Sequence, residues 1–222
     1  MENTDNLKVI AQKNLDIAEN ERLICKASKV KVKQDLKNAK IRESLVKNEI
    51  ELAKLKLILA DKNKDLIGRK GELKDILNFS NNNLKSEEEY AIYNGKIAVI
   101  KRSIAEVQNK ISHLDREIAE EELKIINKKL RVVKERELLA KMQFDHIKLI
   151  KKSAPSEKLT KIKEDTINQQ KELYEAMKDV YRKSVGIRSK EDELADLKKV
   201  LSEKLSEREK VRPPRVKFPT NV

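Results

Sequence analysis

The stretch Leu45–Leu73, LVKNEIELAKLKLILADKNKDLIGRKGEL, carries a leucine at every seventh position. The five leucines of this row are Leu45, Leu52, Leu59, Leu66 and Leu73. A seven-residue spacing is the period at which a helix presents one face to a partner helix in a coiled coil. The companion positions, three residues after each leucine, are Asn48, Leu55, Lys62, Arg69 and Ile76. The stretch therefore predicts a long helix with one strong apolar row and one row broken by polar residues.

A second stripe lies on an adjoining face of the same expected helix. It consists of Val46, Ile50, Ala53, Leu57, Ala60 and Ile67. A helix that is apolar over more than one narrow stripe usually packs against more than one neighbour. No Gly or Pro occurs from Thr4 to Ile67, so the expected helix is long. It ends at the segment 78–83, NFSNNN, because Asn and Ser favour loops.

A second long helix is expected after this loop, because Ser86 and Glu89 have the spacing of a capping box. Its apolar heptads are first Ile97, Ile100, Ile104, Val107, Ile111, Leu114 and Ile118. They then shift to Leu123, Ile126, Leu130, Val133, Ala140, Phe144 and Ile147. Such a shift indicates a local change in supercoiling without a break in the helix. The two expected helices cover about residues 5–78 and 86–152.

Two helices of nearly equal length joined by a short loop favour an antiparallel hairpin. In an antiparallel coiled coil, heptad position a of one helix packs against position d of the other. The two expected helices meet in this way in the register in which the residue numbers of each facing pair add up to 166. Pairs that satisfy this register are Leu52 with Leu114, Leu55 with Ile111, Leu59 with Val107, Leu66 with Ile100 and Leu73 with Tyr93. The same register places Gly71 opposite Gly95. The alternative arrangement is a parallel dimer of extended chains.

The remainder of the chain predicts two shorter helices and a tail. Pro155 disfavours helical backbone before it, and Ser156 begins a third helix that ends near Gly186. Ser189 with Asp192 predicts the start of a fourth helix. The expected divisions are a hairpin over 1–152, two helices at about 156–184 and 190–211 within 153–211, and an extended tail over 212–222, where three prolines favour polyproline II backbone.

Composition agrees with an all-α chain of long helices. Charged residues make up 40% of the 222 residues, aromatic residues 3%, and Trp is absent, which is typical of coiled coils and not of a compact mixed core. Disorder is the competing interpretation, but the persistent Leu and Ile periodicity argues against it. A polar N-terminus and the lack of any run of about eighteen apolar residues predict a soluble, cytoplasmic protein without membrane insertion.

The sequence offers no pattern for catalysis, a cofactor or a metal. The single cysteine, Cys25, cannot form an intramolecular disulfide and is expected to be buried or half-buried. The two histidines, His113 and His146, lie 33 residues apart on one helix, roughly 50 Å, too far to share a metal ion. Nucleotide, zinc-protease and hydrolase motifs are not found. We therefore expect no enzymatic activity.

The best-supported function is that of a structural or interaction protein, a coiled-coil rod or adaptor that forms a homo- or hetero-oligomer in a larger complex. The seam residues of the rod are Leu45, Leu52, Leu55, Leu59, Leu66, Leu73, Ile97, Ile100, Ile104, Val107, Ile111 and Leu114. The tail residues expected to dock a partner are Arg212, Pro213, Pro214, Arg215, Lys217 and Phe218. Basic charge, aromatic character and preset backbone are typical of docking peptides.

Two alternative functions remain open. The net charge of +13 invites nucleic-acid binding through the diffuse positive surface and the tail. Against it, the charge is spread evenly over the helical part, with +5 in residues 1–80, +4 in 81–152 and none in 153–207, and no aromatic residues are interleaved with the basic ones. Only the last fifteen residues, 208–222, are distinctly basic, with +4. The other alternative is a coiled-coil stalk that works with an ATPase of an export apparatus, which is an analogy of shape alone.

Overall fold

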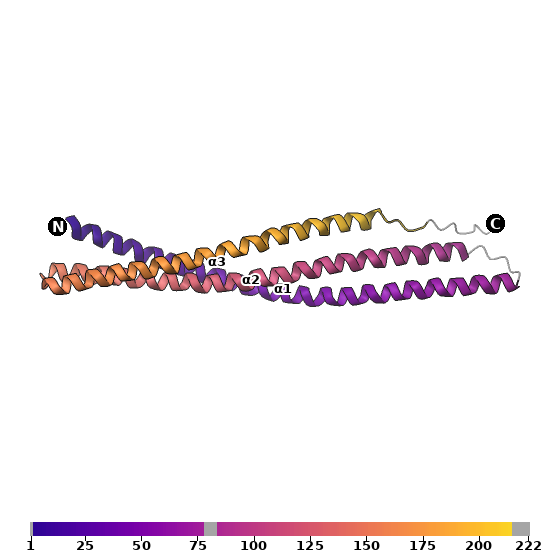
Figure 1. Cartoon of the computed structure of the whole chain (residues 1–222), viewed down its shortest axis with the longest axis horizontal. Helices are drawn as coiled ribbons and strands as arrows, with labels where there is room; N and C mark the ends of the chain where they lie inside the picture. The colour runs from indigo at the N-terminus through magenta and orange to yellow at the C-terminus, as the bar shows by residue number, and fades with distance from the viewer. Residues whose placement is uncertain (1, 78–83, 215–222) are drawn as a thin grey trace. The chain divides into compact units, whose positions relative to one another are not determined.

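The computed structural model describes residues 2–77 and 84–214, and over these residues the chain consists of three long α-helices. Helix α1 covers Glu2–Leu77, α2 covers Leu84–Lys151 and α3 covers Ser156–Lys210 (Figure 1). The prediction of an all-α chain is confirmed. The bounds of α1 and α2 agree with the expected helices within three residues. The expected loop at 78–83 lies outside the described residues.

The start of α2 differs from the prediction. The helix begins at Leu84, two residues before Ser86, so Ser86 lies inside the first turn and is not the N-cap of a capping box. Glu87 is an acidic residue of that first turn, where the positive end of the helix dipole favours it.

The chain forms two compact units, each built from parts of all three helices. Unit 1 contains Met1–Lys37 and Arg116–Glu191, and unit 2 contains Asn38–Asp115 and Asp192–Val222. Every helix thus contributes to both units. In unit 1, α3 packs on α2, and the expected division of the chain at residues 152 and 211 stays a prediction.

Helices α1 and α2 pack antiparallel within one chain in both units. In unit 1, Asn14 Nδ2 donates to Gln143 Oε1 at 3.1 Å, and Lys29 Nζ donates to Asn127 Oδ1 at 3.0 Å. In unit 2, Lys70 Nζ lies 3.0 Å from Glu87 Oε2. These contacts show an intramolecular antiparallel pair of helices.

The register of this pair differs from the predicted one. The residue numbers of the α1–α2 pairs just named add up to 156 or 157, whereas the prediction was 166. Gly95 accordingly faces Ala60, whose Cβ would lie 3.8 Å from a Cβ built on Gly95, and Gly71 has no such neighbour within 4 Å. The predicted pairing of Gly71 with Gly95 is therefore wrong. The cause is that the prediction aligned large apolar residues, while the contact is made by small ones.

The buried residues of α1 and α2 follow an unbroken seven-residue period. The row on α1 is Ala11, Ala18, Cys25, Val32, Ala39, Val46, Ala53 and Ala60. The row on α2 is Ala91, Ala98, Ala105, Ser112, Ala119, Ile126, Val133, Ala140 and Ile147. In unit 1, Cys25, Val32, Ala119 and Ile126 form one core cluster. The α2 row continues past residue 118 without a shift, so the buried face of α2 does not show the predicted shift of the heptads.

The turn between α2 and α3 is short and well capped. Ala154 N–H donates to Leu149 C=O at 3.1 Å, Ser153 N–H donates to Ile150 C=O at 3.0 Å, and Ser153 has a positive φ of 48°. This is the hydrogen-bond pattern of a Schellman motif. The Pro155 carbonyl accepts from Leu159 N–H at 3.3 Å and so begins the next helix. The tight turn directs α3 back along α2.

Helix α3 is one helix, not two, which corrects the predicted pair of short helices. It passes through Gly186 and Ser189 without interruption. A single Gly costs a helix only about 1 kcal/mol relative to Ala. The inward-facing stripe continues across this region through Val180, Ser184 and Ile187, and the packing of its apolar residues outweighs the cost. The predicted cap at Ser189 therefore does not form.

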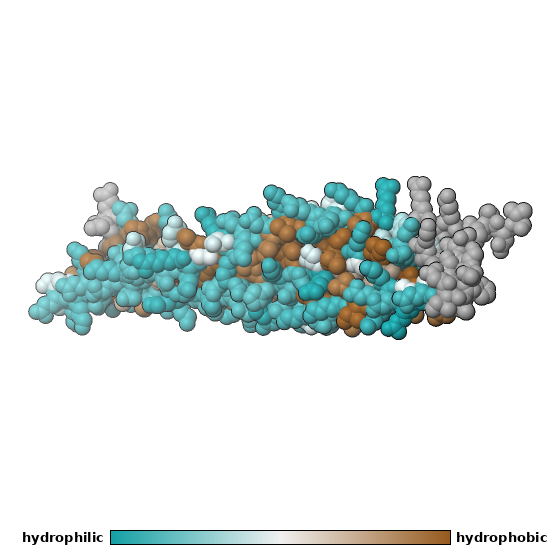
Figure 2. Space-filling view, turned by 45° about the vertical axis from the view of Figure 1, so that its right-hand side comes forward, coloured by the Kyte–Doolittle hydropathy of each residue, from teal (hydrophilic) through white to brown (hydrophobic). Residues whose placement is uncertain are grey.

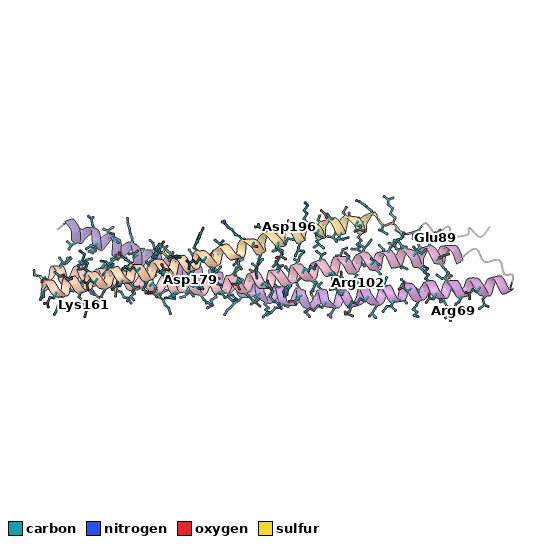
Figure 3. The ribbon with its side chains drawn as sticks, viewed as in Figure 1. Arg69, Glu89, Arg102, Lys161, Asp179 and Asp196 are labelled. Carbon is teal, nitrogen blue, oxygen red and sulfur yellow. The ribbon has the colours of Figure 1, made fainter. Side chains whose placement is uncertain are left out.

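In unit 1, α3 lies antiparallel to α2. Buried Gln169 donates through Nε2 to Glu135 Oε2 at 2.8 Å and to the Glu135 carbonyl at 3.2 Å. Lys190 of α3 bonds Glu117 of α2 at 2.7 Å. Asp179, labelled in Figure 3, comes from α3 and pairs with Lys128 of α2. Opposite charges thus align the two helices along their contact.

Helix α2 is buried on two sides because it contacts both other helices. Next to the row that faces α1 runs a second row of buried residues, namely Ile104, Ile125, Val132 and Leu139. In unit 1, Val132 and Ile125 line grooves together with Val180 and Ile187 of α3. This position explains why the buried large side chains concentrate on α2.

Candidate interaction surfaces

The leucine row that the sequence predicted as the seam of the rod lies on the exposed surface of α1. Its members, together with Leu55 of the companion row, are 52–63% exposed within this chain. The residues concerned are Leu45, Leu52, Leu55, Leu59, Leu66 and Leu73. The buried row is instead the one at Val46, Ala53 and Ala60, one position later along the helix.

The two stripes of α1 in unit 2 face in different directions. The inward stripe combines the buried row with Glu43, Ile50 and Leu57, and the outward stripe combines the leucine row with Ile41 and Leu55. At 3.6 residues per turn, their centres are about 150° apart around the helix axis. Contact with α2 therefore leaves the outward stripe uncovered. We call Ile41, Leu45, Leu52, Leu55, Leu59, Leu66 and Leu73 the leucine stripe.

The predicted seam residues of α2 are better buried than those of α1. Ile104 and Leu114 are buried, and Ile97, Ile100, Val107 and Ile111 are half-buried. These residues flank the Ala-rich row that contacts α1. The structure brings them to the inside of unit 2, while the leucines predicted as their partners lie outside.

Exposed large apolar side chains concentrate on α1. Of the 24 among the described residues, 14 belong to α1, seven to α3 and three to α2. Figure 2 shows apolar residues grouped among hydrophilic ones on the face that it presents. Contiguous apolar surface of this kind in a highly charged chain marks a site of association.

Grooves in unit 2 border the leucine stripe. One, of about 360 Å³, is lined by Leu52 and Ala53 of α1, Ile104 of α2 and Leu205 of α3. A second, of about 280 Å³, is lined by Leu45 and by Leu201. Both leucines of α1 nevertheless remain more than half exposed.

Charges flank the leucine stripe asymmetrically. On one side lie Ser44, Glu51, Ile58, Asp65 and Glu72, and on the other lie Arg42, Glu49, Lys56, Asn63 and Lys70. The first flank carries three negative charges and no positive one, whereas the second carries a net charge of +2. Such flanks determine the choice and the orientation of a partner in coiled coils. Arg69, labelled in Figure 3, lies in the polar part of the companion row.

A second exposed stripe combines aromatic and basic residues on α3 within unit 1. Its members are Lys163, Ile167, Lys171, Tyr174, Lys178, Tyr181, Val185 and Arg188, of which Lys178 is half-buried and the others are exposed. All fall within about 60° of one line along the helix at 3.6 residues per turn. The side chains of Tyr174 and Tyr181 are 64% and 71% exposed. This stripe was not predicted, because its residues lie three or four positions apart and share one surface only when Ser156–Lys210 is a single helix.

Cys25 is the free cysteine of the chain and is buried in unit 1. Burial raises the pKa of its thiol, and nearby Lys129 only partly opposes this rise. Cys25 lines a groove of about 260 Å³ with Val132, Met177 and Val180. A thiol whose pKa is raised is less nucleophilic at neutral pH, so Cys25 acts as a core residue.

Of the predicted tail residues, Arg212 and Pro213 are exposed and Pro214 is half-buried. Tyr90 Oη of α2 donates to the Pro214 carbonyl at 3.4 Å, which places this part of the tail beside the start of α2 in unit 2. The other three tail residues, Arg215, Lys217 and Phe218, lie outside the described residues.

The described residues hold no group of three or more His, Cys, Asp or Glu that could bind a metal ion. His113 is half-exposed, and its Nδ1 lies 4.0 Å from Glu43 Oε1. Within residues 2–77 and 84–214, the helices carry no apolar stretch long enough to cross a membrane. Comparison with models of protein families, with curated proteins and with solved structures gave no match for this chain.

Proposed function

We propose that this chain is a non-enzymatic structural protein that assembles through its helices with copies of itself or with helices of a partner. The observation that carries the proposal is the leucine stripe on α1. It has the seven-residue spacing that a neighbouring helix requires, yet the helices of its own chain leave each of its residues at least half exposed.

The physical argument is the cost of leaving this surface in water. Burying a leucine side chain stabilises an assembly by about 1.5–3 kcal/mol relative to leaving it exposed. A surface with large apolar side chains regularly spaced over the 33 residues from Ile41 to Leu73 therefore favours association. The exposed Arg212 and Pro213 offer a second, smaller contact at the tail.

The test compares assemblies formed by the full chain and by a stripe variant in extracts of the native cell. Leu52→Glu/Leu59→Glu places charges on the stripe, and Val30→Glu is the matched control, since Val30 is 72% exposed on α1 outside the stripe. We expect the wild type and Val30→Glu to elute in complexes larger than the chain alone, and the double variant to leave them. The proposal fails if the wild type elutes alone or if the double variant remains in the complexes.

Binding of single-stranded nucleic acid is a second candidate function, and the aromatic and basic stripe on α3 favours it. Exposed tyrosines interleaved with lysines suit stacking of bases and contact with phosphates. Stacking on one aromatic side chain contributes about 1–3 kcal/mol per base. Tyr174→Ala should therefore weaken binding of a labelled single-stranded oligonucleotide roughly 5- to 150-fold.

Salt and a variant off the stripe control that measurement. The affinity should fall steeply as salt rises, because bound counterions are released from the oligonucleotide. Leu138→Ala, at an exposed apolar residue of α2, should leave it unchanged. Nucleic-acid binding is excluded if the wild type does not retain the oligonucleotide at low salt.

A further inference from the structure

We infer that the leucine stripe of α1 pairs with the leucine stripe of a second copy of this chain, with the two α1 helices parallel and in register. This inference rests on the proposed function and names the partner. It follows from the spacing of the stripe, from the charges beside it and from the polar residues within it.

The stripe has the geometry of a coiled-coil seam. Leu45, Leu52, Leu59, Leu66 and Leu73 occupy one core position of five successive heptads, the a position. The d position carries Ile41, Asn48, Leu55, Lys62 and Arg69. The seam covers 33 residues, about 50 Å at 1.5 Å per residue. It therefore requires a partner helix of similar length with the same period, and α1 of a second copy meets that requirement.

The flanking charges favour a parallel arrangement. In a parallel pair, each g position meets the e position of the following heptad on the partner. This brings Glu51 to Lys56 of the second copy and Asp65 to Lys70 of the second copy, and each contact occurs twice in a symmetric dimer. An antiparallel pair aligned over the whole stripe places g beside g and e beside e. The antiparallel pair would bring Glu51 to Asp65 of the second copy and Lys56 to Lys56 of the second copy. Both contacts are between like charges and therefore repulsive.

The flanking groups are available for such contacts. Glu51 bonds Lys54 of its own helix at 2.7 Å, and Lys70 bonds Glu87 at 3.0 Å. These groups are all at least 44% exposed. Exposed pairs of this kind contribute little stability, so they can exchange for contacts with a second chain.

The polar residues of the seam limit its strength. A single Asn in a coiled-coil core specifies register at some cost in stability, and Asn48 is placed to pair with its own copy. Lys62 and Arg69 each meet a like charge in the parallel dimer. The contact is therefore strongest over Ile41–Leu59 and weaker towards Leu73. The expected dimer is reversible, and Lys62→Leu should make it tighter.

Sedimentation equilibrium of the purified full chain tests the dimer. We expect a concentration-dependent equilibrium between monomer and dimer. Leu52→Glu should weaken it tenfold or more, Lys62→Leu should strengthen it, and Val30→Glu should leave it unchanged. All variants should keep their helices, because the substituted side chains are exposed, and circular dichroism verifies this. A chain that stays monomeric, or a dimer insensitive to Leu52→Glu, overturns the inference.

Charge reversal tests the orientation. Glu51→Lys and Lys56→Glu should each weaken self-association about two- to tenfold, and an equimolar mixture of the two variants should recover part of the loss. Lys54→Ala is the control, because it removes the internal pair of Glu51 without altering either flank. An antiparallel dimer is indicated, and the parallel arrangement overturned, if Glu51→Lys tightens the association.

A disulfide provides an independent measure of orientation. In a Cys25→Ala background, which preserves a row already rich in alanine, Leu45→Cys should form a disulfide-linked dimer under mild oxidation. Failure to form it overturns the parallel register. A chain that is monomeric when pure, but enters larger complexes through the leucine stripe in extracts, refutes self-association and leaves the proposed function standing.

Discussion

At the scale of single residues, the alanines at the α1–α2 contact determine which faces of these two helices are buried. Ala18, Ala53 and Ala60 of α1 and Ala98, Ala105 and Ala140 of α2 are all at most 5% exposed. Small side chains allow two helices to approach closely, and close packing then gains dispersion contacts along the whole backbone. Leucines of the same helix are consequently left on the outside.

An enlarged side chain in this row should destabilise the protein. Ala18→Leu adds three carbon atoms at a fully buried position and should lower the free energy of unfolding by about 1–3 kcal/mol. The denaturant midpoint measures this change. Ala27→Leu, at an exposed position of α1 in the same unit, should change it little. Equal effects of the two substitutions would contradict close packing of this row.

Glu122 should weaken unit 1 at neutral pH. Burial raises the pKa of its carboxyl, Asp35 and Glu191 raise it further, and Lys31 opposes them. When the pKa of a carboxyl is higher in the folded than in the unfolded state, the protein loses stability as the pH rises from the unfolded-state pKa through the folded-state pKa. Glu122→Gln should therefore raise the melting temperature at pH 7, and the gain should vanish in acid.

Glu121 provides the matched control for this pH dependence. A hydrogen bond from Lys124 lowers the pKa of the Glu121 carboxyl, which is the opposite direction. Glu121→Gln should therefore give no gain at pH 7. If both glutamines raised the melting temperature equally, the cause would be a general loss of negative charge.

At the scale of elements, α3 shows that one glycine does not end a helix whose inner stripe continues. Gly186 is exposed, has no atom within 4 Å of its would-be Cβ, and has no positive φ. Its backbone is therefore compatible with any residue that favours helices. The turn at 152–155 differs, because it combines the positive φ of Ser153 with Pro155.

Substitutions at Gly186 test this continuity. Gly186→Ala should stabilise the protein by about 0.5–1 kcal/mol, because alanine loses less backbone entropy. Gly186→Pro should destabilise it by about 3 kcal/mol, because proline removes a helical hydrogen bond. Thermal unfolding followed by circular dichroism measures both. Tolerance of proline would indicate two separate helices.

The tail should be dispensable for folding. Deletion of 212–222 removes the contact of 3.4 Å between Tyr90 and the Pro214 carbonyl, which is long for a hydrogen bond donated by a hydroxyl group. Helicity and melting temperature should therefore remain within error of the wild type, while capture of a partner by the tail weakens. Loss of helicity on this deletion would assign the tail to the fold.

At the scale of the whole molecule, the sequence was sufficient to predict α1 and α2 as long helices, their bounds within three residues and their antiparallel pairing, but it predicted two short helices in place of α3. The register was not predictable from the largest apolar residues, because Leu52 and Leu59 are more conspicuous than Ala53 and Ala60. The correct signal was nevertheless present, since the buried row of α1 repeats every seven residues from Ala11 to Ala60. The packing of α3 depended on contacts that a linear pattern does not specify.

Hydrogen exchange should reflect the central position of α2. In unit 1, residues 119–147 of α2 are covered by α1 on one side and by α3 on another, so their amides should exchange more slowly than those of 159–187 in α3. Mass spectrometry of exchanged peptides measures this difference. Comparable protection of both segments would contradict two-sided burial of α2.

The second buried row of α2 also has a consequence for synthesis of the chain. The helices emerge from the ribosome in the order α1, α2, α3, so α1 is available to cover its own side of α2 first. Ile125 and Val132 line grooves with residues of both α1 and α3, so they are only partly covered until α3 has been translated. The nascent hairpin therefore passes through a stage that displays a partly covered apolar face, and a chaperone that binds such faces would act between completion of α2 and completion of α3.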